Sequence, residues 1–93
     1  MKDFEKHILT VEASLTVKLN SMKKYNIVIN GKRTSISLEP LVWDILHDVA
    51  EGQDCSVHEL CSFIDSRKEE GANLSSAIRV FLLSYLYIKN KKG

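Results

Sequence analysis

The sequence predicts an α+β fold in which a β-hairpin is followed by three helices. The dipeptide Asn30-Gly31 separates two runs in which polar and apolar residues alternate, as they do in strands. After the second run, Pro40 opens a stretch with helical periodicity, and Ser56 opens another. A third stretch, from about Asn73, is apolar at helical spacing. These observations give the order hairpin, helix, helix, helix.

Composition limits the chain to a few classes of protein. Its 93 residues make one domain, and a content of 44% hydrophobic and 27% charged residues is typical of a globular protein. No run approaches the roughly 18 apolar residues of a membrane helix, and the N-terminus lacks the apolar stretch of a signal peptide. Two cysteines are too few for a secreted disulfide framework. We therefore expect a cytoplasmic protein without a membrane partner.

Residues 1–24 are predicted to be an accessory segment, and residues 25–93 the domain proper. Apolar and polar residues alternate over residues 11–19, which predicts a strand. Phe4, Ile8, Val11 and Leu15 also have the spacing of a helix, so both structures remain open. Met22 is a second candidate for the natural start of the chain.

The hairpin is predicted to have strands over residues 25–29 and 32–38. Asn and Gly both tolerate the positive φ angles of a type I′ turn, so Asn30-Gly31 is a strong hairpin signal. Alternation in the second strand gives it a polar and an apolar face. The polar face carries Arg33, Ser35 and Ser37, and the apolar face carries Thr34, Ile36 and Leu38.

Two short amphipathic helices are expected next. The first starts at Pro40, whose missing N–H would be unpaired in an opening turn, and Gly52 is its expected C-cap. The second has Ser56 as N-cap, with Glu59 completing a capping box, and is expected to end at Gly71. Their apolar stripes are Val42, Ile45, Leu46 and Val49 in the first helix, and Val57, Leu60, Cys61 and Ile64 in the second.

The third helix is apolar over more than half of its circumference. One stripe consists of Leu74, Ala77, Ile78, Phe81, Leu82 and Tyr85, and it is widened by Val80, Leu83 and Tyr87. Such a helix is buried on several sides. Because a chain this short buries a sufficient core with difficulty, the pattern predicts a partner subunit.

Charge is distributed unevenly, although the formal net charge is only +1. Residues 22–38 carry four basic residues and no acidic one, whereas residues 39–54 carry five acidic residues and no Lys or Arg. A basic hairpin beside an acidic helix is one interpretation, and chance clustering of surface charges is the other.

Strand, Pro-started helix, tight turn and Ser-capped helix, in this order, resemble the ribbon-helix-helix family of bacterial repressors, which includes Arc-like and plasmid copy-control proteins. The match runs from residue 32 to about residue 68; the hairpin and third helix around it resemble a subfamily of short bacterial proteins. The resemblance implies an intertwined homodimer that inserts a β-ribbon into the major groove of double-stranded DNA. It implies a transcriptional regulator with no enzymatic activity and no cofactor.

The resemblance makes Arg33, Ser35 and Ser37 the base-contacting residues. Arg can donate two hydrogen bonds to guanine, and Ser can bond several base edges. A groove about 12 Å wide accepts two strands about 4.8 Å apart but not a flat sheet of four. Either the added hairpin strands splay away from DNA, or the dimer is a protein-interaction module without DNA access. A further alternative is an antitoxin-like repressor that binds another protein through residues 1–24 or the third helix.

The remaining site residues also follow from the resemblance. A helix N-terminus offers free N–H groups to an anion, and a lysine adds a plain phosphate contact. The implied phosphate contacts are Lys32, Ser56, Val57 and His58. The implied dimer core is Ile36, Leu38, Ile45, Leu60, Ile64, Ile78, Phe81 and Leu82.

Other reactive side chains predict neither catalysis nor a metal site. Cys55, His58 and Cys61 are spaced at threes, but a structural zinc needs four ligands, and Cys61 belongs to an apolar stripe. No histidine accompanies a nucleophile in a recognisable motif. Trp43 lies off the main stripe of its helix, which favours sheet packing or a dimer interface over ligand stacking.

Overall fold

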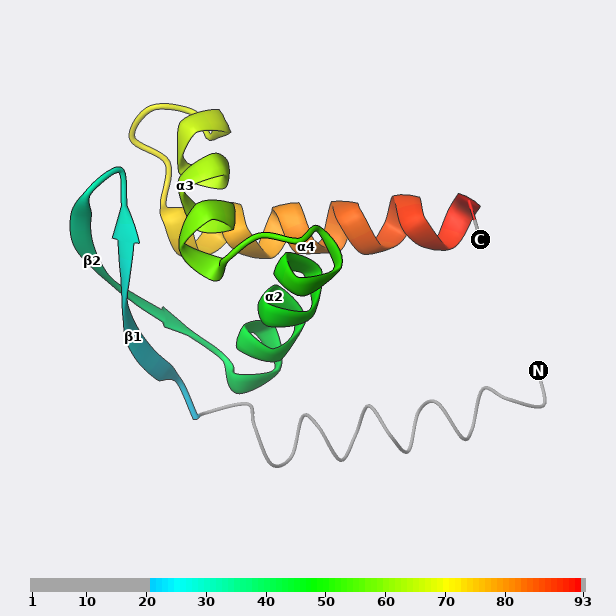
Figure 1. Ribbon diagram of the computed structural model, residues 1–93, viewed down its shortest axis with the longest axis horizontal. Coiled ribbons are helices and arrows are strands. Elements are labelled where there is room, and N and C mark those ends of the chain that lie inside the picture. Colours follow the sequence, from blue (N-terminus) through cyan, green and yellow to red (C-terminus); the bar gives the residue numbers. More distant parts are fainter. Residues whose placement is uncertain (1–20, 93) are drawn as a thin grey trace.

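The computed structural model describes residues 21–92, which form a hairpin and three helices (Figure 1). In chain order the elements are β1 (Lys23–Ile29), β2 (Lys32–Leu38), α2 (Pro40–Gly52), α3 (Val57–Arg67) and α4 (Leu74–Lys92). The predicted α+β fold is confirmed. The strand predicted over residues 11–19 lies outside the described residues.

The hairpin has the predicted turn. β1 and β2 are antiparallel, and Ile29 pairs with Lys32 across the turn. Asn30 has a φ of 50° and Gly31 a φ of 82°, which are the positive values that a type I′ turn needs. The first strand begins at Lys23, slightly earlier than predicted.

Gly31→Val should destabilise the protein through backbone conformation alone. A Cβ at Gly31 would meet no heavy atom within 4 Å, so the added Cβ creates no clash. A β-branched residue resists positive φ, at a cost of about 1–2 kcal/mol in the free energy of unfolding. Urea titration measures this loss. Gly52→Ala, at a glycine without positive φ, is the control and should be neutral or stabilising. Equal midpoints for Gly31→Val and the wild type would contradict the turn.

The three helices start where the sequence predicts. Pro40 is the first residue of α2, and Ser56 is the N-cap of α3. Before α4, the Asn73 side-chain oxygen accepts a hydrogen bond from the Ser76 N–H over 3.0 Å. Each start therefore has a local cause in the sequence.

Two predicted helix ends are wrong. Gly52 is the last residue of α2 and not its C-cap, which is Gln53 with a φ of −96°. The left-handed residue is Asp54 (φ 56°), whose short polar side chain tolerates this conformation. α3 ends at Arg67, and Gly71 takes its positive φ of 82° in the loop before α4. After α2 the positive φ thus falls two residues beyond the expected glycine, and after α3 the helix ends four residues before it.

One core joins the apolar face of the hairpin to the three helices. The largest fully buried side chains are Leu38, Leu46, Cys61 and Ile78. They come from β2, α2, α3 and α4, one from each. In β2, Ile36 and Leu38 are buried, so the predicted apolar face is confirmed.

Trp43 fixes β1 to α2. Its side chain is 4% exposed, and its N–H donates to the Lys23 carbonyl oxygen over 2.8 Å. Its ring meets Tyr25 edge to face, with centroids 5.0 Å apart and an angle of 89° between the rings. Trp43 thus packs against the sheet, one of its two predicted roles.

An ion pair joins the start of α2 to α4. Arg79 donates to Oε1 of Glu39 from Nη2 over 2.8 Å and from Nε over 3.0 Å. These hydrogen bonds hold the pKa of Glu39 below its ordinary value. Both groups are partly exposed, so the pair contributes at most about 1 kcal/mol. That contribution is present above the ordinary carboxyl pKa and is lost as pH falls through the lowered pKa.

Only part of the apolar surface of α4 packs against the core. Ile78 and Leu82 are buried, but Val80, Leu83 and Tyr87 are 62%, 69% and 63% exposed. The C-terminal half of α4 runs past the other elements (Figure 1). Among the described residues, none of the helices has the length and hydropathy needed to cross a membrane.

Candidate nucleic-acid interface

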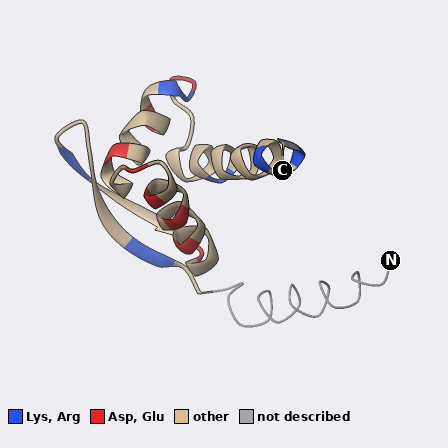
Figure 2. Ribbon diagram, turned by 45° about the vertical axis from the view of Figure 1, so that its right-hand side comes forward, with Lys and Arg blue, Asp and Glu red and all other residues tan. Residues whose placement is uncertain are grey.

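The solvent face of the hairpin combines polar residues from both strands. Three cross-strand pairs lie on it: Lys24 with Ser37, Asn26 with Ser35, and Val28 with Arg33. Ser37 is half-buried, and the other five residues are exposed. Figure 2 shows basic segments on the hairpin and acidic segments along α2, so the charge separation seen in the sequence is present in the fold.

The predicted base contacts Arg33, Ser35 and Ser37 share this face. Lys24 and Asn26, which lie directly across from the two serines, were missed by the sequence reasoning. The signal was available, because a two-residue turn fixes the register, and counting back along β1 gives the partner of each residue in β2.

Lys32 lies on the other face of the hairpin. It pairs with Ile29, whose side chain is buried, and neighbouring residues of a strand point to opposite faces. Its side chain is exposed near the turn. A phosphate contact by Lys32 stays a prediction.

The outer edge of β1 is covered by α3. The Val28 N–H donates to Nδ1 of His58 over 2.9 Å, and the Asn30 N–H donates to Oγ of Ser62 over 3.3 Å. The Ser62 hydroxyl in turn donates to the Val28 carbonyl over 3.5 Å. β1 therefore lies between β2 and α3.

The outer edge of β2 is open at Arg33 and Ser35. The N–H and C=O of Val28 point away from β2, so the N–H and C=O of its partner Arg33 point away from β1. Because this pattern repeats at every second residue of an antiparallel pair, the N–H and C=O groups of Ser35 and Ser37 also point outward. The Ser37 carbonyl accepts a hydrogen bond from Ser75 at the start of α4 over 3.3 Å. The outward backbone groups of Arg33 and Ser35 have no partner within residues 21–92. An unpaired edge of this kind can pair with another strand.

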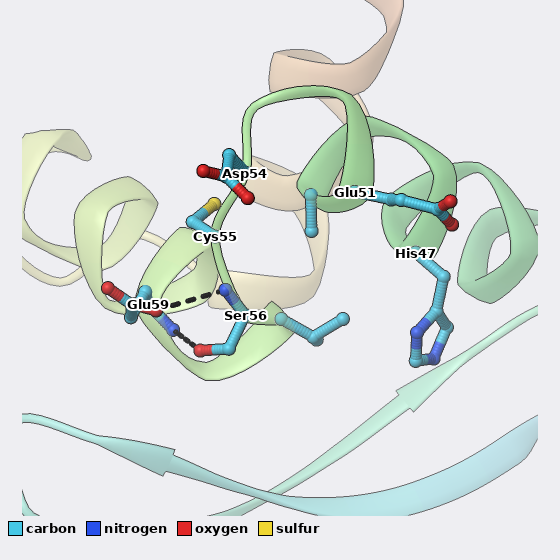
Figure 3. Close-up of a pocket in the computed structure, with 8 residues that line it drawn as sticks. His47, Glu51, Asp54, Cys55, Ser56 and Glu59 are labelled. Carbon is cyan, nitrogen blue, oxygen red and sulfur yellow. Dashed lines mark hydrogen bonds between the residues drawn. The ribbon is translucent and has the colours of Figure 1, made fainter.

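The N-terminus of α3 is closed by the predicted capping box. Oγ of Ser56 accepts from the Glu59 N–H, and the Ser56 N–H donates to Oε1 of Glu59, both over 3.0 Å (Figure 3). The bonds from Ser56 hold the pKa of Glu59 below its ordinary value. Of the predicted phosphate-binding N–H groups, that of Ser56 is occupied; those of Val57 and His58 have no acceptor in the described part of the chain.

An open hollow of about 490 Å³ lies beside this helix end (Figure 3). Its lining includes the carboxylates of Glu51, Asp54 and Glu59, which together repel an anion. Cys55 also lines it, but Cys61 is fully buried, and burial raises its pKa to about 11. Over residues 21–92, no three His, Cys, Asp or Glu side chains are placed to hold a metal ion.

Of the eight residues predicted to form the dimer core, six are buried within the single chain and two are partly buried. Ile36, Leu38, Leu60, Ile64, Ile78 and Leu82 belong to the core, and Ile45 and Phe81 pack against it. β1 and α4 supply part of this burial within the chain itself. A role for these eight residues between subunits stays a prediction.

Comparison with known proteins places the chain in a family. Residues 22–86 match the ribbon-helix-helix domain. An uncharacterized protein from Bordetella pertussis Tohama I has a similar structure, with a TM-score of 0.67 and 26% sequence identity, over 89% of this chain and 71% of that chain. No curated protein matches the sequence.

Proteins with this domain are in general DNA-binding regulators that form dimers, and they are typically not enzymes. The match includes β1, β2, α2, α3 and most of α4. The chain therefore belongs to the ribbon-helix-helix domain family.

Proposed function

We propose that the chain is a dimeric transcriptional regulator that binds a specific DNA sequence with the solvent face of its hairpin. The observation that carries this proposal is a strand face without acidic residues, on which Arg33 and Ser35 are exposed and Ser37 is half-buried. Such a ribbon can enter the major groove, where Arg33 can donate two hydrogen bonds to O6 and N7 of guanine. Repression and a location in a bacterial cytoplasm are expectations that accompany the proposal.

The dimer in this proposal forms through the open edge of β2. Two antiparallel copies of β2 can bond each other through the outward backbone groups of Arg33 and Ser35. Because Ser75 bonds the Ser37 carbonyl on this same edge, α4 starts beside it. The exposed apolar residues of α4 can then continue the interface and explain the excess apolar surface of this helix.

Selection from a pool of randomised duplexes tests the proposal. We expect one sequence to be enriched and to bind with a Kd of about 10⁻⁸–10⁻¹¹ M at physiological salt. Two chains should bind each duplex, as sedimentation of the complex would measure. Enrichment of no sequence, with a Kd weaker than about 10⁻⁵ M, is the non-specific range and would contradict the proposal.

A protein-interaction dimer, or an antitoxin-like repressor with a protein partner, is the second candidate. Val80, Leu83 and Tyr87 favour it, because large apolar side chains exposed along one helix are typical of protein-binding surfaces. Under a pure interaction function the duplex pool would show no enrichment. Under the antitoxin-like function, enrichment and a protein partner would occur together.

A further inference from the structure

Two lysines of the hairpin are exposed on opposite faces. Lys24 pairs with Ser37 and shares the face of Arg33, whereas Lys32 pairs with Ile29 and shares the face that is turned toward the core. If Arg33 meets DNA, Lys24 therefore points toward the DNA and Lys32 points away from it.

The width of the major groove determines what β1 can touch. Pairing of two copies through β2 gives the strand order β1-β2-β2-β1. With strands about 4.8 Å apart, β2 lies about 2.4 Å and β1 about 7.2 Å from the two-fold axis. The groove is about 12 Å wide, so its half-width is about 6 Å. β2 thus lies over base edges, and β1 lies over the phosphates that border the groove.

The N-terminus of α3 is a poorer position for a phosphate. α3 lies beyond β1, because His58 and Ser62 bond the outer edge of that strand. Its first turn lines the same hollow as Glu51, Asp54 and Glu59, which we call the acidic hollow. A phosphate there would meet both repulsion and a capping box that already occupies one N–H group.

We infer that β1 holds the DNA backbone, with Lys24 as the phosphate ligand and Asn26 as a second donor, in place of the N-terminus of α3. This inference rests on the proposed function, because it assigns further contacts to the same surface. It also removes the conflict between a four-stranded sheet and the groove. β1, the flanking strand, then lies on the DNA backbone and does not have to enter the major groove.

Lys24→Ala and Lys32→Ala form a matched pair, since both remove one exposed positive charge from the hairpin. Their affinities for the enriched duplex and for a scrambled duplex are measured at several salt concentrations. Lys24→Ala should weaken both complexes by the same factor. It should lower the slope of log K against log salt by about 0.9 for each lysine, hence about 1.8 for a dimer. Lys32→Ala should keep the wild-type slope, because Lys32 points away from the DNA and Lys24 takes the place of the phosphate contact that the resemblance implies for Lys32.

Glu59→Gln tests the helix end separately, because Gln preserves a capping box and removes the charge. Its affinity should stay within about twofold of the wild type, since solvent screens a carboxylate distant from the phosphates. A tenfold gain in the DNA affinity of Glu59→Gln would overturn the inference. An equal loss of salt slope in Lys24→Ala and Lys32→Ala would overturn it as well. The inference would also be overturned if the wild-type chain bound the enriched duplex and Lys24→Ala had the same slope of log K against log salt as the wild type. A wild-type chain that enriches no duplex would instead overturn the proposed function.

Discussion

Replacing Trp43 with alanine is expected to lower the free energy of unfolding by about 3–5 kcal/mol. The indole is 4% exposed, and it contacts Tyr25 edge to face. Alanine would leave a cavity where β1 meets α2. It would also remove the indole N–H that donates a hydrogen bond to the Lys23 carbonyl oxygen over 2.8 Å.

Urea titration followed by circular dichroism measures this effect, at one fixed protein concentration because the proposed dimerisation would add to apparent stability. Leu41→Ala is the control, since Leu41 lies in the same helix but is 46% exposed. Leu41→Ala should lower the free energy of unfolding by less than about 1 kcal/mol. Equal losses for Trp43→Ala and Leu41→Ala would mean that β1 does not pack on α2 as described.

Arg33→Ala is expected to cost about 1–3 kcal/mol in binding to the enriched duplex, which corresponds to a roughly 5- to 150-fold weaker Kd. Arg33 is the long side chain of β2 on the solvent face, where it is followed by Ser35 and Ser37. Loss of the Arg33 side chain should relax the sequence preference at one base pair and leave the preference at the other base pairs unchanged. Lys24→Ala, in contrast, should weaken all sequences alike.

Arg67→Ala controls for charge. Arg67 belongs to α3, and its guanidinium lies over the Phe63 ring at 4.8 Å from the centroid, outside the hairpin. This variant removes the same charge as Arg33→Ala and should keep the sequence preference of the wild type. If both arginine variants lost affinity to the same degree on every duplex, Arg33 would act through charge and not through base recognition.

The features predicted from sequence are those with local causes. Asn30-Gly31 sets its own turn, and Ser56 with Glu59 forms a capping box within four residues. Gly71 was wrongly expected to end α3, which ends at Arg67, and Gly52 was expected to be the C-cap of α2 but is its last residue, with Gln53 as the C-cap. At α2 the chain instead takes its left-handed turn at Asp54, a residue type that also tolerates positive φ.

Features that depend on tertiary contacts could not be predicted. The hydrogen bonds from Val28 to His58 and from Asn30 to Ser62 join residues 30 or more positions apart. They close one edge of the hairpin and leave the edge of β2 open, and nothing in the local sequence marks them. The acidic hollow likewise arises only when the turn between α2 and α3 brings Glu51 and Glu59 to the lining of one hollow.

Methylation interference on the enriched duplex tests most directly whether the hairpin reads the major groove. A methyl group on guanine N7 lies in that groove and removes the acceptor that an arginine needs. The expected result is interference at guanines placed symmetrically in two half-sites, with the signal at one guanine of each half-site absent in Arg33→Ala. Binding that tolerates N7 methylation everywhere, or that is blocked only by methylation in the minor groove, would contradict a ribbon in the major groove.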